Sequence, residues 1–288
     1  MVIILNLYNE TKEILIKYNI SANKKLGQNF LIDDETVNGI IKAADIKKED
    51  LIIEIGPGLG TLTKFLIEEA GKVFCIELDT RMIGILNDRF KLCNNFKLIN
   101  EDVLKVDLQK LIKEEKVGDI KDVKIVANLP YYITTPIIMK LLEEKLDIES
   151  ITVMVQKEVA DRLVDVPGGK NSGAITYAIN YYTKPKKVLD VPNTAFIPAP
   201  EVNSSVIKLD VRDKPYVNVK NEELLFKIIK IAFMQKRKTL LNALTNGNLA
   251  SKEEIQKMLI DLKFDLKVRG EKLSLEDFAK ISDYIENR

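Results

Sequence analysis

The chain has 288 residues, 46% of them hydrophobic, which suffices for a sizeable folded core. Its 44 lysines and arginines nearly balance its 43 aspartates and glutamates, so the net charge of +1 excludes a uniformly basic nucleic-acid-binding chain but allows local basic patches. The complete absence of histidine excludes Ser-His-Asp and Cys-His catalysis and histidine-ligated zinc or haem, so any chemistry must use other side chains, backbone groups or a reactive cofactor.

Short apolar runs rich in β-branched residues predict strands in the first half of the chain. They are Leu51–Ile55, Lys72–Ile76, Phe96–Ile99, Val123–Ala127 and Ile151–Val155. Apolar residues at helical spacing predict helices between the first three runs, at Thr61–Ala70 and Asp79–Phe90. A further helix is expected after the fourth run, with Thr135 as its cap, Pro136 in the first helical position and its end near Leu146.

This alternation of strands and helices predicts the fold class, which is α/β with a mostly parallel sheet covered by helices on both faces. Runs around Lys187–Leu189 and Val206–Val211 are expected to complete the sheet. Val191–Ser205 is a loop with several prolines, and a long loop inside a compact domain is often functional.

The pattern becomes helical in the last quarter of the chain. Glu222–Leu244 is predicted to form one long amphipathic helix, and capping-box sequences that begin at Ser251 and Ser274 predict two more. We therefore expect an α/β domain of residues 1–211, whose first 21 residues form an N-terminal extension, and a small all-helical domain of residues 212–288.

A glycine-rich segment, Gly56-Pro57-Gly58-Leu59-Gly60, follows the first predicted strand and precedes a helix. Glycines there allow a tight turn and close approach to a ligand. Glu77 ends the next strand, 21 residues beyond Gly56, which is the spacing at which a carboxylate accepts hydrogen bonds from ribose hydroxyls. Thr61 occupies the place of the third glycine in a dinucleotide-binding fingerprint, which favours a nucleoside ligand without a pyrophosphate. The alternative is an ordinary glycine-rich turn with an exposed acid.

Gly56, Glu77, Asp102 and Asn128 each follow one of the successive predicted strands, at the edge of the sheet where α/β proteins bind ligands. For Asp102 the alternative is a solvated acid in a turn. In the segment Asn128-Leu129-Pro130-Tyr131, the Asn128 oxygen and a turn carbonyl offer acceptors for an exocyclic amine, and Tyr131 offers a ring for stacking on a base. An ordinary turn at the end of a strand fits the same four residues equally well.

Several segments together form a highly specific pattern between about residues 22 and 245. They are Lys24–Leu31, Glu54–Thr63, Glu77–Asp79, Asn128–Tyr131, Gln156–Arg162, Phe196–Ser204 and Phe233–Leu244. In this combination the sequence closely resembles the KsgA (RsmA) type of small-subunit (16S) ribosomal RNA adenine N6,N6-dimethyltransferases. The first twenty residues match no pattern of that family.

The resemblance implies a Rossmann-like class I methyltransferase that uses S-adenosylmethionine as methyl donor and needs no metal. It implies cofactor contacts from Asn29, Leu31, Gly56, Gly58, Glu77, Asp102 and Asn128. It assigns the catalytic positions to Asn128 and Tyr131, which belong to the motif that holds N6 of the target adenine, and to Phe196, which closes the pocket. Tyr131 and Phe196 would stack on the base. The implied substrate is a pair of adjacent adenines near the 3′ end of 16S rRNA within an immature 30S subunit, each converted to N6,N6-dimethyladenosine.

Binding to RNA requires a cationic surface. Residues 214–238 contain seven basic and two acidic residues, a local net charge of +5. On a continuous helix, several of these cations would share one face. The predicted RNA-binding residues are Lys227, Lys230, Lys236, Arg237 and Lys238, with Lys24 and Lys25 as a second group near the expected cleft. The alternative is an ordinary solvated helix face.

Three other functions stay open at this point. A related enzyme methylates adenine N6 in 23S rRNA and confers antibiotic resistance, but the segment Leu26–Leu31 and the C-terminal pattern favour the small-subunit enzyme. An NAD-dependent oxidoreductase is disfavoured by Thr61 and by the lack of an evident proton donor. A non-catalytic ribosome-assembly or transcription factor on the same fold is disfavoured by the intact Asn128–Tyr131 motif.

The remaining sequence features bear on compartment and metals. Cys75 and Cys93 are too few for an all-cysteine zinc site, and Cys75 lies in an apolar run that predicts a small core residue. No apolar stretch approaches the roughly 18 residues of a membrane span. We expect a cytoplasmic protein with no membrane association and no obligate protein partner.

Overall fold

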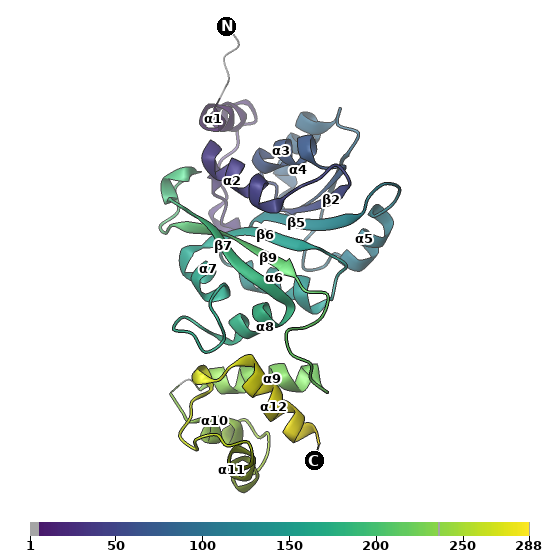
Figure 1. The fold of residues 1–288 in the computed structure, drawn as a ribbon. Coiled ribbons are helices and arrows are strands. Elements are labelled where there is room, and N and C mark those ends of the chain that lie inside the picture. Colours follow the sequence, from purple (N-terminus) through teal and green to yellow (C-terminus); the bar gives the residue numbers. More distant parts are fainter. Residues whose placement is uncertain (1–5, 236, 288) are drawn as a thin grey trace. The chain divides into compact units, whose positions relative to one another are not determined.

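The computed structural model describes residues 6–235 and 237–287, and these form two compact units. The first unit comprises the chain up to Ala160 together with Lys186–Val211, and the second comprises Asp161–Pro185 together with the chain from Arg212 onward. Figure 1 shows a sheet with helices in the first unit and helices, coloured green to yellow, in the C-terminal part of the second.

The first unit is built around a seven-stranded sheet with the strand order β4-β3-β2-β5-β6-β9-β7. Parallel pairing joins β4, β3, β2, β5 and β6, whereas β9 runs antiparallel to β6, so the sheet is mostly parallel, as predicted. The strands are β2 Asp50–Ile55, β3 Lys72–Glu77, β4 Phe96–Asn100, β5 Asp122–Asn128, β6 Ser150–Gln156, β7 Thr183–Val191 and β9 Ser204–Val211. Each predicted strand corresponds to one of them.

Helices of the first unit cover the sheet. The helices are α1 Leu7–Lys17, α2 Asp34–Ala44, α3 Thr61–Glu69, α4 Thr80–Phe90, α5 Leu108–Glu115, α6 Thr134–Glu143 and α7 Lys157–Leu163, the last of which ends in the second unit. Apolar residues of α2 and α3 share one buried cluster with residues of β2, β3, β5 and β6, and this cluster forms the core on one face. Figure 1 shows α6 on the opposite side of the sheet. None of the helices in the described ranges is long and apolar enough to cross a membrane.

The start of α6 differs from the prediction. The helix begins at Thr134, one residue before the predicted cap, and Pro136 occupies its third position. The Thr134 hydroxyl donates to the Pro130 carbonyl, 3.1 Å away, which ties the helix to the preceding turn. Proline fits here because the N–H groups of the first turn have no acceptor within the helix.

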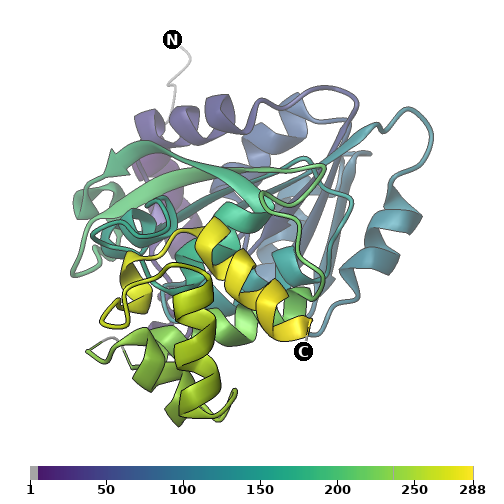
Figure 2. The same ribbon diagram turned by 60° about the horizontal axis from the view of Figure 1, so that its bottom comes forward.

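The second unit is helical. Its helices are α8 Ala174–Tyr182, α9 Glu222–Met234, α10 Leu240–Asn246, α11 Lys252–Asp261 and α12 Leu275–Glu286, and those from α9 onward are coloured green to yellow in Figure 2. Both predicted capping boxes are present. The hydroxyls of Ser251 and Ser274 accept from the backbone N–H of Glu254 and Asp277, and the carboxylates of these acids accept from the backbone N–H of the two serines.

The apolar faces of helices α8 to α12 form one buried core.

The predicted single helix over Glu222–Leu244 is wrong. The chain leaves the helix after Met234 and starts α10 at Leu240, with Thr239 as the new N-cap. The Leu240 N–H donates to the Val268 carbonyl, 2.7 Å away, instead of to a preceding turn. After the break, Leu240, Leu241 and Leu244 lie in the same buried core as the apolar residues of α9.

The sequence predicted a domain boundary at residue 211. The structure divides the chain differently, because Asp161–Pro185 belongs with the helical unit. Tyr177 and Tyr181 of α8 lie in the helical core. The Tyr177 hydroxyl donates to the Leu273 carbonyl at 2.6 Å, and its ring packs edge-on against Phe278. These long-range contacts leave no mark in local composition, so the sequence pattern did not indicate them.

Candidate active site

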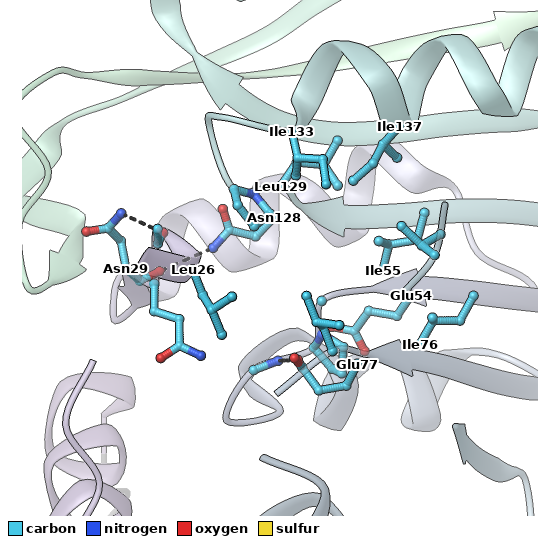
Figure 3. A pocket seen from close by; sticks show the side chains of 18 of the residues that line it. Leu26, Asn29, Glu54, Ile55, Ile76, Glu77, Asn128, Leu129, Ile133 and Ile137 are labelled. Carbon is cyan, nitrogen blue, oxygen red and sulfur yellow. Dashed lines mark hydrogen bonds between the residues drawn. The ribbon is translucent and has the colours of Figure 1, made fainter. Parts of the chain in front are cut away.

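A cavity opens at the carboxyl ends of the parallel strands, entirely within the first unit. Figure 3 shows Glu54, Ile55 and Glu77 on one side of it and Asn29 and Asn128 on the other. Every residue predicted to bind the cofactor or to take part in catalysis lines this cavity. They are Asn29, Leu31, Gly56, Gly58, Glu77, Asp102, Asn128, Tyr131 and Phe196. The structure therefore brings together residues that are up to 167 positions apart in the chain.

The glycine loop between β2 and α3 has a backbone that side chains would strain. Gly56, Gly58 and Gly60 have φ values of +69°, +57° and +82°. A Cβ atom on Gly56 would meet nothing within 4 Å, so this part of the loop faces open space. A Cβ atom on Gly60 would lie 2.6 Å from the Phe90 ring. The loop thus leaves room for a ligand on one side and packs against α4 on the other.

Glu77 is the last residue of β3, and its buried side chain contacts the glycine loop. One carboxylate oxygen accepts from the Gly58 N–H at 3.0 Å, and the other accepts from the Asp79 N–H at 2.8 Å. Burial raises the pKa of Glu77, while these backbone hydrogen bonds oppose the rise. The spacing of 21 residues read from the sequence thus corresponds to a direct contact between the acid and the loop.

Glu54 is a cavity residue for which the sequence pattern predicted no role. It lies in β2, one residue before the strand ends, with 1% of its surface exposed, and it accepts from the Thr63 hydroxyl at 2.6 Å and from the Cys75 thiol at 3.3 Å. Burial raises its pKa to about 7, and the nearby charge of Glu77 adds to this effect. The signal in the sequence was an acid inside an otherwise apolar strand just before the glycines. Cys75 is a core residue, as predicted, and bonds to this acid.

Asp102 lies in the turn after β4 and is half-buried. One of its oxygens accepts from the Leu104 N–H at 3.0 Å, so the carboxylate is fixed at the rim of the cavity. Its neighbours Glu101 and Val103 line the same wall. The acid is therefore part of the cavity and also stabilises its own turn.

The opposite wall joins the end of β5 to the segment before α2. Asn128 is the last residue of β5, and its amide nitrogen donates to the Asn29 carbonyl at 3.4 Å. Asn29 in turn donates to the Gly27 carbonyl at 3.1 Å. Because the nitrogen of Asn128 is engaged in this contact, its oxygen is the group that it offers to a ligand.

Gln28 also anchors the segment of residues 26–31, and it was not predicted as a site residue. Its amide nitrogen donates to Asp79 at 2.8 Å, and its oxygen accepts from the Asn23 N–H at 2.8 Å. The Arg81 guanidinium beside Asp79 keeps the pKa of that carboxyl below its usual value. Residues 26–31 are thus tied to the start of α4, next to Glu77.

The aromatic residues of the site come from two distant loops. The half-buried Tyr131 places its hydroxyl 2.7 Å from the Ser204 hydroxyl at the start of β9. Phe196 lies in β8 (Phe196–Ile197), which pairs antiparallel with β1 (Phe30–Leu31) so that Phe196 lies opposite Leu31. The proline-bearing loop therefore reaches the cavity by strand pairing, and Phe196 is 3% exposed there.

The predicted RNA-binding residues divide between the two units. Lys24 and Lys25 are exposed in a short 3-10 turn, Lys24–Leu26, that leads directly into the cavity lining. Lys227 and Lys230 lie on α9, and both are exposed. Arg237 and Lys238 are exposed but lie after the end of α9, so the expected single face with Lys227 and Lys230 does not exist. Lys236 lies outside the described residues.

Comparisons with known proteins identify the family. Residues 19–287 match the family described as ribosomal RNA adenine dimethylase. The chain belongs to this family. It is 48% identical to the ribosomal RNA small subunit methyltransferase A of Clostridioides difficile (strain 630), with 99% of this chain and 98% of that protein covered. It is 49% identical to the protein of the same name from Clostridium acetobutylicum, with 96% and 98% covered.

Two solved structures resemble this chain. A dimethyladenosine transferase from Plasmodium falciparum is 28% identical, with a TM-score of 0.73 over 88% of this chain and 95% of that one. The 23S rRNA methyltransferase ErmE has a TM-score of 0.68 at 21% identity, covers 90% of this chain and shares its fold. The resemblance and the class I methyltransferase fold predicted from the sequence are confirmed. Membership of an adenine dimethylase family sets aside the NAD-dependent oxidoreductase.

Proposed function

We propose that this adenine dimethylase transfers methyl groups from S-adenosylmethionine to N6 of two adjacent adenines near the 3′ end of 16S rRNA, within an immature 30S subunit in the cytoplasm. The observation that carries the proposal is that the glycine loop and Glu77 face the Asn128–Tyr131 turn across one and the same cavity. Near-full-length similarity to proteins named small subunit methyltransferases supports the choice of rRNA.

The cofactor end of the cavity fits a nucleoside. The open face of Gly56 admits a ligand close to the backbone, and Glu77 places a buried carboxylate beside it. We assign Glu77 to the ribose hydroxyls, Asp102 to the adenine amine, and Gly58, Asn29 and Leu31 to the surrounding walls. The bound cofactor supplies a reactive methyl on sulfur, so the chain has to supply only orientation and electrostatics.

The other end of the cavity fits the target base. The Asn128 oxygen accepts one N6 hydrogen, and a carbonyl of the adjoining turn accepts the other, which aims the nitrogen lone pair at the methyl group. The same oxygen stabilises the positive charge that develops on nitrogen. Tyr131 is the accessible ring on which a flipped base stacks, whereas the buried Phe196 forms a wall of the pocket.

RNA contacts are assigned to both units. Lys24 and Lys25 lie beside the lining segment and suit phosphates that flank the target base. We propose that the helical unit recognises rRNA through Lys227, Lys230, Arg237 and Lys238, together with Lys236. This assigns catalysis to residues 1–211 and recognition to residues 212–288, with Asp161–Pro185 as part of the second unit's core.

The test combines purified protein, labelled S-adenosylmethionine and small subunits from a strain that lacks this methylation. Mass spectrometry of the digested rRNA is expected to find N6,N6-dimethyladenosine at two neighbouring positions near the 3′ end of 16S rRNA. Modification of 23S rRNA alone would favour the resistance-type enzyme. Binding to small subunits without any methyl transfer would favour a non-catalytic assembly factor.

A further inference from the structure

The N-terminal helix α1 belongs to the first unit but contributes no residue to the cavity lining. Its Glu10 bridges two other helices. One carboxylate oxygen of Glu10 lies 2.9 Å from the Lys64 ammonium on α3, and the other pairs with the Arg89 guanidinium on α4. The acid of α1 therefore joins the helices that flank the glycine loop.

Arg89 also contacts the glycine loop itself. One of its terminal nitrogens pairs with Glu10 while the other donates to the carbonyl oxygen of Leu59. The guanidinium suits this arrangement because its planar fork can bond two acceptors at once. Gly58, the residue before Leu59, donates its N–H to Glu77. A continuous chain of contacts thus runs from Glu10 through Arg89 and the loop backbone to the buried acid of the cavity.

Packing supports the same connection. Leu59 is 1% exposed and lies in one apolar cluster with Met82, Leu86 and Phe90 of α4, against which residues of α1 also pack. The side chain of Arg89 is 14% exposed and that of Glu10 is 22% exposed, so water and salt screen their attraction less than on an open surface. By contrast, Lys17 and Asp88 form a second α1–α4 pair whose side chains are 66% and 44% exposed.

We infer that Glu10 and Arg89 are positioning residues that hold the glycine loop in its cofactor-binding shape, which makes α1 part of the cofactor site. The loop needs such support because three of its five residues are glycines, whose backbones have many alternative conformations. Arg89 fixes the Leu59 carbonyl, and Glu10 fixes Arg89. This inference rests on the proposed function, because it concerns the cofactor assigned there.

The test measures binding of S-adenosylhomocysteine, the demethylated cofactor, by calorimetry at 25 °C. Arg89→Met is expected to raise its Kd by about tenfold, the scale of one net hydrogen bond to a preorganised group. Glu10→Gln is expected to raise it by about threefold, because Arg89 remains but loses its charged partner. Arg89→Lys is expected to fall between the parent and Arg89→Met, since one ammonium cannot reproduce both contacts. Lys17→Met serves as the control and is expected to leave the Kd unchanged.

The double variant separates positioning from general stability. If Glu10 acts through Arg89, Glu10→Gln combined with Arg89→Met has the Kd of Arg89→Met alone, whereas independent effects would multiply. Thermal unfolding measured in parallel shows that each protein is folded at 25 °C. A merely structural role would lower the Tm and leave the Kd of the folded protein unchanged.

The outcomes are distinct. An unchanged Kd in folded Arg89→Met would overturn the inference, and so would multiplied effects in the double variant. If Arg89→Met does not fold, the Glu10→Gln variant decides. The Glu10 side chain is partly exposed to solvent, and glutamine has the same size as glutamate, so this variant is expected to fold. An unchanged Kd in Glu10→Gln would then overturn the inference. A parent protein that binds no S-adenosylhomocysteine would overturn the proposed cofactor, and this inference with it.

Discussion

The two ends of the cavity are built differently. At the glycine-loop end, Glu77 is buried and both of its oxygens already accept backbone hydrogen bonds. At the other end, Asn128 makes a single long contact of 3.4 Å, Tyr131 is half-buried and Tyr132 is 58% exposed. One end is therefore preorganised for a small ligand that it encloses. The other keeps its acceptor and ring accessible, as a base delivered by a large RNA requires.

This contrast predicts its largest effect at Asn128. Asn128→Ala removes an acceptor aimed at the target amine, so the single-turnover methylation rate at saturating cofactor is expected to fall about 100- to 1000-fold. Folding and rRNA affinity are expected to stay near those of the parent. Tyr132→Phe, which retains the exposed ring, is the matched control. A near-normal rate for Asn128→Ala would leave this segment as a structural turn.

The buried Glu54 at the glycine-loop end is expected to make the free energy of unfolding depend on pH. The pKa of Glu54 is about 7 in the folded chain against an ordinary value of 4.5. The folded state therefore holds the proton more tightly, and Glu54 destabilises it increasingly as the pH rises from about 4.5 to about 7, by up to roughly 3 kcal/mol. Glu54→Gln cannot titrate. Its gain in free energy of unfolding over the parent is expected to be larger at pH 8 than at pH 5.

Denaturant unfolding at the two pH values measures this difference. Glu101→Gln, which replaces an exposed acid at the rim of the same cavity, is the matched control variant. If Glu54→Gln shifts the stability equally at both pH values, the carboxyl group does not titrate in this window and its burial has no energetic consequence there.

The third prediction sets Glu77 against Asn128. Glu77→Ala is expected to weaken S-adenosylmethionine binding by about 1.5–3 kcal/mol, because it removes a hydrogen bond to a charged group. The affinity for rRNA is expected to remain nearly intact, which calorimetry with cofactor and with rRNA can separate. Glu77→Gln keeps the size and is expected to weaken binding less. Unchanged cofactor affinity in Glu77→Ala would remove the ribose role.

The smallest effects per residue are expected outside the cavity. Neutralising Lys236, Arg237 and Lys238 together is expected to weaken rRNA binding and to reduce the log–log salt slope by about 0.7 to 0.9 for each phosphate that the variant no longer binds. The equivalent change at Lys227 and Lys230 tests α9 separately, because Arg237 and Lys238 lie after the end of this helix. A slope that does not change in either variant would identify these residues as a solvated surface.

Local pattern was enough to predict the sheet and one edge of the site. Strand-length apolar runs ended at Gly56, Glu77, Asp102 and Asn128, and parallel strands bring their carboxyl ends to one edge, so these residues had to converge. Family resemblance supplied Asn29, Leu31 and Phe196, for which no local signal exists. Glu54 was visible as an acid within an apolar strand, but its burial and its bonds to Thr63 and Cys75 required the packed structure.

The sequence by itself determined the strands, the glycine loop, the placement of Glu77 and Asp102 at strand ends and the family, because each depends on short-range periodicity or on a contiguous motif. Only the tertiary structure decided the pairing of Leu31 with Phe196, the break between α9 and α10, and the transfer of Asp161–Pro185 to the helical core. It also decided that Glu10 reaches the glycine loop through Arg89. These features depend on contacts between residues far apart in the chain, whose free energies exist only once the surrounding elements have packed.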